Sequence, residues 1–193
     1  CANFYYIRHS GPPGAGRARN TAIPLVQGKY TYFLDADDTF NVRALRTAWF
    51  QATRNHVDLM FLPYNLSISG ENKPMFSADE RLWKKKKWTT QARKEAAYSL
   101  INYPWNRMIR TEVLLAGDIF FGPTVVHNDI QFHWDTITQA ATVAFFTKPV
   151  CLHRKSPKMK QITNIATKER VTVVDSILFT DRMLRRQGCY KKQ

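Results

Sequence analysis

The chain has 193 residues, a length that suits one domain with a sizeable buried core. Hydrophobic residues make up 44% of the chain and aromatic residues 13%, which excludes a disordered or low-complexity protein. The 29 Lys and Arg residues outnumber the 15 Asp and Glu residues, so the net charge is +14. A charge of this sign attracts polyanions such as nucleic acid, an anionic membrane or a phosphorylated small molecule.

The cysteines, Cys1, Cys151 and Cys189, are widely spaced and form no Cys-x-x-Cys pair. They suggest no disulfide framework, so we expect a reducing compartment, the cytoplasm. No apolar run approaches the length of a transmembrane helix, and the N-terminus has no signal-peptide pattern. The sequence therefore predicts a soluble chain without a transmembrane segment, and it leaves association with a membrane surface through basic residues open.

The beginning of the chain predicts a strand, a loop, a helix and a second strand. Asn3–Ile7 is a short apolar run that predicts a strand, and a loop rich in Gly and Pro follows it over residues 9–16. Arg17–Gln27 has apolar residues at helical spacing, and Pro24 should kink or tighten this helix. Tyr30–Leu34 is aromatic, β-branched and apolar, which is typical of a buried strand. Together these segments predict a βαβ-like unit.

The rest of the chain continues the alternation of helices and strands, which predicts an α/β fold with a mostly parallel sheet. Residues 65–88 interrupt the pattern with polar residues, a Gly, a Pro and a lysine run, so we expect a variable excursion there. Helices are expected over Asn41–Asn55, Thr90–Ile101, Thr111–Leu115, Ile130–Ala140 and about Lys168–Arg186, and strands over Val57–Leu62, Trp105–Ile109, Thr142–Phe146 and Val150–His153.

Carboxylates crowd at the end of the strand Tyr30–Leu34, where Asp35, Asp37 and Asp38 follow in quick succession. Neighbouring carboxylates repel one another, and a bound cation commonly stabilises such a cluster. In open α/β sheets, ligands bind at this end of the strands. The alternative is a solvated turn in which Asp38 or Thr39 caps the next helix. Spacing alone leaves a metal site and a capped turn both open.

The loop Gly11–Gly16 and the residues Arg17, Arg19 and Asn20 form a second candidate site. Glycines let the backbone approach a ligand closely, and arginines supply forked donors for phosphate oxygens. A helix N-terminus beside them favours an anion. The pattern is neither a P-loop nor a dinucleotide-binding GxGxxG, so a plain loop is the alternative.

The loop, helix, strand and Asp-x-Asp motif, in this order, resemble the family-2-type glycosyltransferases of the GT-A fold. The resemblance covers most of the chain and is weakest over residues 65–88 and in the last helix. It implies a GT-A (Rossmann-like) fold, with a mixed, mostly parallel sheet flanked by helices, in a single catalytic domain over residues 1–193. The matching stretches are Gly14–Asn20, Gly28–Asp38, Trp105–Arg110, Phe121–Phe132 and Pro149–Arg154.

Within that domain, the resemblance implies a donor- and metal-binding part over residues 1–64 and an acceptor-side part with the C-terminal helix over residues 89–193. The chain departs from the family in two ways. The usual first strand-helix-strand unit, which binds the nucleotide base, is lacking, so we expect a truncated chain or a reduced base-binding half. Asn128 stands where the family usually has Glu, and His153 stands where it usually has Tyr.

The resemblance also implies a reaction, the metal-dependent transfer of a sugar from a UDP-linked donor to a hydroxyl of a glycan or glycoprotein acceptor. Mn²⁺ or Mg²⁺ would neutralise the diphosphate leaving group. Because hard cations prefer oxygen ligands, Asp37 is expected at the metal and Asp35 at the metal or the ribose. His153 is expected to complete the metal sphere, although a lone His on a strand is often an ordinary structural residue.

Asp129 is the expected catalytic base for the acceptor hydroxyl, which favours inversion and leaves retention open. Its alternative role is to cap the helix that begins at Ile130. Trp105 and Asn128 are expected on the acceptor or sugar side, where the Trp105 ring would stack on a sugar; core packing is the alternative for Trp105. The donor-binding candidates are Arg19, Asn20, Asp35 and Arg154.

The run Lys84–Lys87 lies between Trp83 and Trp88, and basic residues beside aromatic ones suit single-stranded nucleic acid. A solvated face is the more ordinary explanation of such a run. A basic nucleic-acid-binding module is therefore the alternative hypothesis, whereas the glycosyltransferase hypothesis expects no specific nucleic acid. A metal-dependent nucleotidyl or phosphoryl transferase with the same carboxylates is a further alternative.

Overall fold

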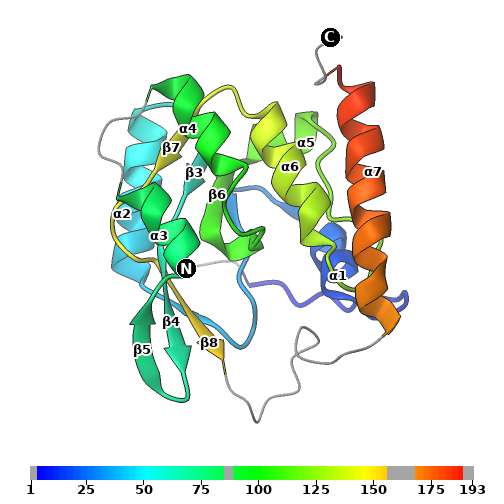
Figure 1. Ribbon diagram of the computed structural model, residues 1–193, viewed down its shortest axis with the longest axis horizontal. Helices are drawn as coiled ribbons and strands as arrows, with labels where there is room; N and C mark the ends of the chain where they lie inside the picture. The colour runs from blue at the N-terminus through cyan, green and yellow to red at the C-terminus, as the bar shows by residue number, and fades with distance from the viewer. Residues whose placement is uncertain (1–3, 85–88, 156–167, 189–193) are drawn as a thin grey trace.

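The computed structural model describes residues 4–84, 89–155 and 168–188. Its strands form two four-stranded sheets, and most of its helices surround the first of them (Figure 1). The helical segments are α1 (Ala15–Ala22), η1 (Ile23–Leu25), α2 (Val42–Arg54), α3 (Ser77–Trp83), α4 (Thr90–Ala97), η2 (Pro104–Asn106), α5 (Thr111–Ala116), α6 (Asp129–Gln139), η4 (Lys168–Thr172) and α7 (Val173–Arg186).

The first sheet has the strand order β1-β6-β3-β7. β6 runs antiparallel to both β1 and β3, whereas β3 and β7 are parallel. The strand bounds are β1 Tyr30–Tyr32, β6 Arg107–Arg110, β3 Leu59–Phe61 and β7 Val143–Phe145.

Helices cover both faces of this sheet because side chains alternate between the faces along each strand. Leu59 and Phe61 belong to a buried cluster with residues of α4, α5 and α6. Met60, between them in sequence, belongs to the opposite cluster with the alanines of α2. The small side chains of Ala44 and Ala48 let α2 lie close to the sheet.

The second sheet has the strand order β2-β8-β4-β5. β4 and β8 are parallel, and the other two pairings are antiparallel. The mixed α/β fold is confirmed, but the expectation of a mostly parallel sheet is corrected, because only β3–β7 and β4–β8 are parallel among the described strands. The strand bounds are β2 Thr39–Phe40, β8 Cys151–Lys155, β4 Tyr64–Ile68 and β5 Glu71–Pro74.

One further expectation is wrong. The predicted strand at Asn3–Ile7 is absent over its described part, residues 4–7, whose side chains are exposed. A strand needs a neighbour for its backbone groups, and this segment pairs with no described strand. Within the predicted excursion, the described residues up to 84 contain most of the hairpin β4–β5 and helix α3. Tyr64 at the start of β4 and Asp79 on α3 are fully buried and hydrogen-bonded to each other at 2.8 Å.

Candidate active site

The carboxylates of the Asp-x-Asp motif lie in a tight turn after β1. The amide of Asp38 donates to the carbonyl of Asp35 at 3.1 Å, which closes the turn. One carboxylate oxygen from each of Asp35, Asp37 and Asp38 lies within 4.8 Å of the others. Just before the turn, the ring of Phe33 meets that of Phe121 edge-on at 5.1 Å. The turn therefore gathers oxygen ligands of the kind that a hard divalent cation takes.

Asp38 ties the acidic turn to β8. Its carboxylate is buried and accepts hydrogen bonds from the His153 ring Nδ1 at 2.9 Å and from the Arg154 amide at 2.9 Å. Because the proton on Nδ1 faces Asp38, the lone pair of the neutral His153 ring lies on Nε2, the nitrogen available to a metal. Burial and the Asp38 charge raise the pKa of the neighbouring Cys151 thiol, which is therefore an unreactive free cysteine. The predicted role of His153 as a metal ligand remains a prediction.

Arg19 on α1 connects the acidic turn to Asp129. Its guanidinium forms an ion pair with Asp35 and lies over the Phe121 ring at 5.1 Å from the centroid. Burial raises the pKa of Asp129, and the positive charge of Arg19 opposes that shift. The structure thus brings the predicted donor-binding arginine, the acidic turn and the predicted base into one region.

Asn20, a predicted donor-binding residue, holds α1 on the segment before α6. Its side-chain amide donates to the carbonyl of Phe121 at 3.0 Å, and its side-chain oxygen accepts from the amide of the same residue at 2.8 Å. These two hydrogen bonds to the backbone fix α1 on the segment before α6, and the donor-binding role of Asn20 remains a prediction. Arg154, a further predicted donor-binding residue, has an exposed side chain on β8 beside the turn.

Gly16 and Asn128 hold the glycine-rich loop against the start of α6. A Cβ atom at Gly16 would lie 2.8 Å from Cγ and 2.9 Å from Oδ1 of Asn128. Asn128 is buried and donates from Nδ2 to the carbonyl of Val125 at 3.2 Å. The predicted contact of Asn128 with the acceptor remains a prediction. Its close packing against residue 16 of α1 explains why that residue is a glycine.

Gly16→Ala should lower the free energy of unfolding by about 1–3 kcal/mol, because the added methyl group overlaps Asn128. Gly14→Ala is the matched control, since its Cβ would come no closer than 3.8 Å to Arg17. Urea unfolding of both variants measures the difference. The double variant Gly16→Ala/Asn128→Gly should recover stability, and a Gly16→Ala variant as stable as Gly14→Ala would contradict the packing argument.

Asp129 lies in the first turn of α6, where the helix dipole favours a carboxylate. Burial nevertheless raises the pKa of Asp129 above the ordinary aspartate value. A hydrogen bond from its own amide and the charges of Arg19, His127 and Arg107 act in the opposite direction. The helix N-cap is Asn128, which makes no side-chain capping bond. A carboxylate whose pKa is raised by burial is a better proton acceptor, which suits a general base.

Arg107 is a fully buried cation behind Asp129 that the sequence indicates only as part of the Trp-Asn-Arg match. Its guanidinium donates to the Tyr103 carbonyl at 3.2 Å and to the His133 ring Nδ1 at 2.8 Å, and it lies 4.8 Å from the Phe61 ring centroid. Burial lowers the pKa of Arg107 to about 9, and the Asp129 charge opposes this. Burial and the Arg107 charge lower the pKa of His133, so this ring stays neutral and accepts the bond.

Trp105 does not offer a ring face to a sugar, so the stacking expectation is corrected in favour of core packing. Its side chain is 1% exposed. Its ring stacks on Tyr103 at 4.3 Å and on His153 at 4.8 Å, and it meets Tyr64 edge-on at 4.9 Å. Trp105 therefore positions His153, which in turn binds Asp38.

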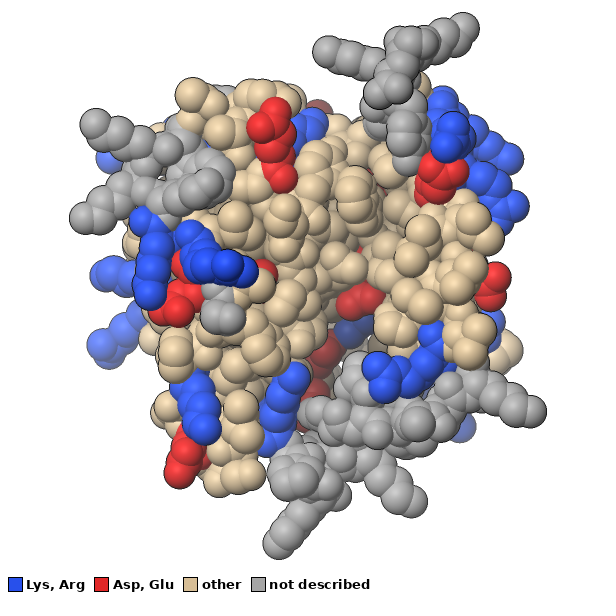
Figure 2. Space-filling model, viewed as in Figure 1, with Lys and Arg blue, Asp and Glu red and all other residues tan. Residues whose placement is uncertain are grey.

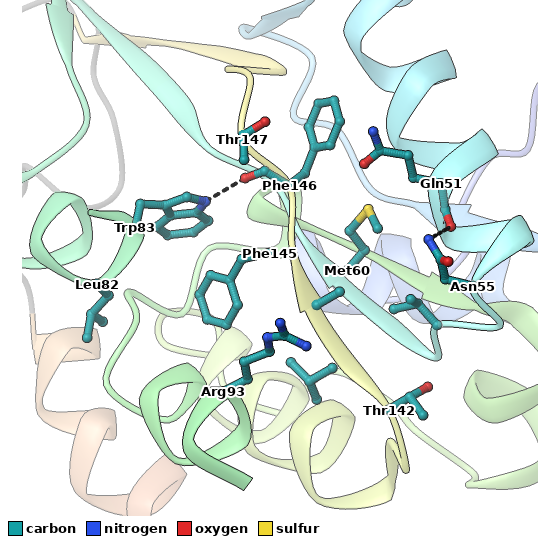
Figure 3. A pocket seen from close by; sticks show the side chains of 13 residues that line it. Gln51, Asn55, Met60, Leu82, Trp83, Arg93, Thr142, Phe145, Phe146 and Thr147 are labelled. Atoms are coloured by element: carbon teal, nitrogen blue, oxygen red, sulfur yellow. Dashed lines mark hydrogen bonds between the residues drawn. The ribbon is translucent and has the colours of Figure 1, made fainter. Parts of the chain in front are cut away.

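A separate pocket of about 620 Å³ lies at the β7 edge of the first sheet. It is lined from α2, α3, α4 and β7, and Figure 3 shows the Trp83 indole nitrogen donating to the Phe146 carbonyl at 2.8 Å on one side of it. None of the predicted site residues lines this pocket. In the lysine run, Lys84 pairs with Glu80 at 3.1 Å, whereas Lys85–Lys87 and Trp88 lie outside the described residues.

The model of the glycosyl transferase family 2 matches residues 2–116, which is more than half of the chain. The chain therefore belongs to the family-2 glycosyltransferases, and its mixed sheets flanked by helices are those of a GT-A fold. Among curated proteins it is similar to the uncharacterized glycosyltransferase EpsJ of Bacillus subtilis (strain 168), at 23% identity over 155 residues that cover 78% of this chain and 45% of EpsJ.

Among solved structures, the chain is similar to TarS 1–349 of S. aureus in complex with UDP-GlcNAc. The TM-score is 0.65 and the identity 20%, over 80% of this chain and 42% of that one. The complex of TarS 1–349 with UDP matches with a TM-score of 0.59 and 21% identity, over 89% of this chain and 52% of that one. The chain thus spans about half or less of the length of these relatives. Among the described residues, none of the helices is both long and apolar enough to cross a bilayer.

Proposed function

We propose that this chain carries the catalytic site of a metal-dependent glycosyltransferase that moves a sugar from a UDP-linked donor to a hydroxyl of a glycan or glycoprotein. The observation that supports it best is the juxtaposition of the acidic turn, Arg19 and Asp129. Figure 2 shows acidic and basic groups together in a hollow on this face of the molecule. The TarS complexes with UDP-GlcNAc and UDP support the UDP-linked donor.

Different residues of the chain would act on the leaving group and on the acceptor. Arg19 and Arg154 would bind the diphosphate of the donor. Arg19 would then leave its ion pair with Asp35 and bind phosphate oxygens instead. Asp129 would accept the proton of the acceptor hydroxyl as its oxygen bonds to the anomeric carbon and the bond from that carbon to the diphosphate breaks. This single displacement inverts the anomeric centre. We accordingly assign the donor side to residues 1–64 and the acceptor side to residues 89–193.

The metal would be Mn²⁺ or Mg²⁺, held by Asp37 and Asp35, with His153 Nε2 as a further ligand. The oxygen donors of the turn fit such a hard cation, and Asp38 already orients the His153 ring. When bound, the cation supplies Lewis-acid stabilisation of the diphosphate leaving group. We also propose a reducing compartment, the cytoplasm, in keeping with the buried free thiol of Cys151.

Mn²⁺ with UDP should raise the melting temperature of the protein, whereas UDP with EDTA should raise it far less. At a UDP concentration 100-fold above its dissociation constant, the expected increase is about 5–10 °C. Asp37→Ala should abolish the Mn²⁺-dependent part of this increase, because it removes a metal ligand. Differential scanning fluorimetry with UDP and UDP-GlcNAc measures the effect.

The matched control is Glu112→Gln on α5, which removes an exposed carboxylate away from the acidic turn. This variant should respond to Mn²⁺ and UDP as the unaltered chain does. An Asp37→Ala variant that keeps the full Mn²⁺-dependent increase would overturn the assignment of Asp37 to the metal.

A further inference from the structure

Helix α7 exposes several large apolar side chains along one face, whereas Leu184 near its C-terminal end is buried. The small polar residues Ser176 and Thr180 face the protein and are 3% and 5% exposed. The large apolar residues Val174 and Leu178 point the other way and are 53% and 52% exposed. A helix on the surface of a globular protein ordinarily buries its apolar face and exposes its polar one. Over residues 174–180 of α7 the arrangement is the reverse, which leaves an apolar outer face uncovered.

Specific contacts fix this orientation of the helix. The Ser176 hydroxyl lies 2.9 Å from the Thr124 hydroxyl in the segment that leads to α6. Near its C-terminal end, the side chain of Gln187 donates to the buried Asp135 at 3.0 Å. Turning α7 to bury its apolar residues would break these bonds, so the apolar face cannot turn inward at low cost.

The apolar face begins before α7 and forms a short outer stripe of Val171, Val174, Ile177 and Leu178. Val171 is 71% and Ile177 54% exposed. Their three- and four-residue spacing places them on one side of the helix. Basic residues follow directly: Arg182, Arg185 and Arg186 are exposed in the last two turns, and Arg185 pairs with Asp181 at 2.8 Å. Figure 2 shows basic groups with an acidic group beside them at the C-terminal end of α7, and uncharged surface along its middle.

The geometry points to the surface of an anionic lipid bilayer as the occupant of the outer stripe. An apolar strip that ends in arginines matches the boundary between lipid tails and anionic headgroups. The net charge of +14 adds a long-range attraction to the same surface. The stripe is only roughly 10 Å long, given 1.5 Å per helical residue, so it is too short to supply the roughly 800 Å² per partner of a stable protein dimer. Apolar contact and charge together provide the two signals that stable membrane association requires.

Co-sedimentation of the purified chain with lipid vesicles tests this inference. The chain should sediment with vesicles of phosphatidylcholine and phosphatidylglycerol (3:1) and stay in the supernatant with phosphatidylcholine alone. Val174→Gln/Leu178→Gln should weaken binding to the anionic vesicles about tenfold or more, because both side chains lose their apolar burial. Arg182→Gln/Arg186→Gln should also weaken binding to the anionic vesicles, and the remaining binding should depend less on the salt concentration.

Phe50→Gln is the matched control, because Phe50 is an exposed apolar residue on the unrelated helix α2. It should bind vesicles as the unaltered chain does. Circular dichroism melts should show that the outward-facing substitutions leave the fold intact. The inference is overturned if the anionic vesicles fail to bind the chain or if the α7 variants bind them unchanged. Light scattering that finds a dimer, lost in Val174→Gln/Leu178→Gln, without vesicle binding would assign the stripe to a second copy and equally overturn it.

Discussion

Asp129→Asn should lower the rate of sugar transfer by about 10²–10⁴-fold, because asparagine cannot accept the proton of the acceptor hydroxyl. The amide keeps the shape of the carboxylate and its place at the start of α6. Donor binding should therefore change little, and the loss should appear in kcat. Release of free UDP in the presence of an acceptor, at saturating donor, measures this effect.

The raised pKa of Asp129 also predicts how the reaction depends on pH. The base acts as a carboxylate, so kcat/KM should fall as the pH drops through the pKa of Asp129, which burial places above the ordinary aspartate value of about 3.9. An acid limb at the ordinary aspartate value, or one that Asp129→Asn leaves unmoved in the residual activity, would contradict this assignment.

The same shift predicts the effect of the variant on stability. Because the pKa of Asp129 is higher in the folded chain than in the unfolded one, the folded state binds more protons between these two values. Stability from this group is therefore present at low pH and is lost as the pH rises through the folded pKa. Asp129→Asn removes the buried charge, so it should be at least as stable as the unaltered chain at pH 7. If Asp129→Asn is inactive because it is unfolded, its free energy of unfolding at pH 7 will be lower than that of the unaltered chain.

Most of the elements could be predicted from the sequence because their signals are local. α2 has one alanine-rich face and an Asn41 cap whose side chain accepts from the Ala44 amide at 3.0 Å. Pro24 shortens α1 and converts its end to the 3-10 turn η1, as its missing amide proton requires. The acidic turn could also be predicted locally, because its three carboxylates directly follow an apolar strand in the sequence.

The features that escaped prediction depend on contacts between distant segments. The strand polarity of the two sheets follows from which strands are neighbours, and no local pattern records that β6 lies between β1 and β3. The sequence match of Arg107 does not indicate its burial, because Phe61, Tyr103 and His133, which contact its guanidinium, come from other segments. The contact of Gly16 with Asn128 joins residues 16 and 128 and is equally invisible in sequence.

Trp105 illustrates the same limit, since an aromatic residue beside a predicted site fits both a sugar platform and a core. The two roles differ in what a truncation costs. Trp105→Ala should lower the free energy of unfolding by about 3–5 kcal/mol, because it empties a fully buried site between Tyr64, Tyr103 and His153. For a chain of this size, the melting temperature should fall by about 6–20 °C.

Trp49→Ala is the matched control, because Trp49 lies on α2 and is partly exposed, and its truncation should cost well under the Trp105 value. Trp105→Phe should lie between the two, since a smaller ring keeps part of the stacking on Tyr103 and His153. The weaker stacking also loosens the His153 imidazole that bonds Asp38. Trp105→Phe should therefore weaken the Mn²⁺-dependent increase in melting temperature, whereas Trp49→Ala should leave it intact. A sugar platform predicts the reverse pattern: near-normal unfolding free energy for Trp105→Ala, an unchanged response to Mn²⁺ and UDP, and a raised KM for the sugar-bearing substrate alone.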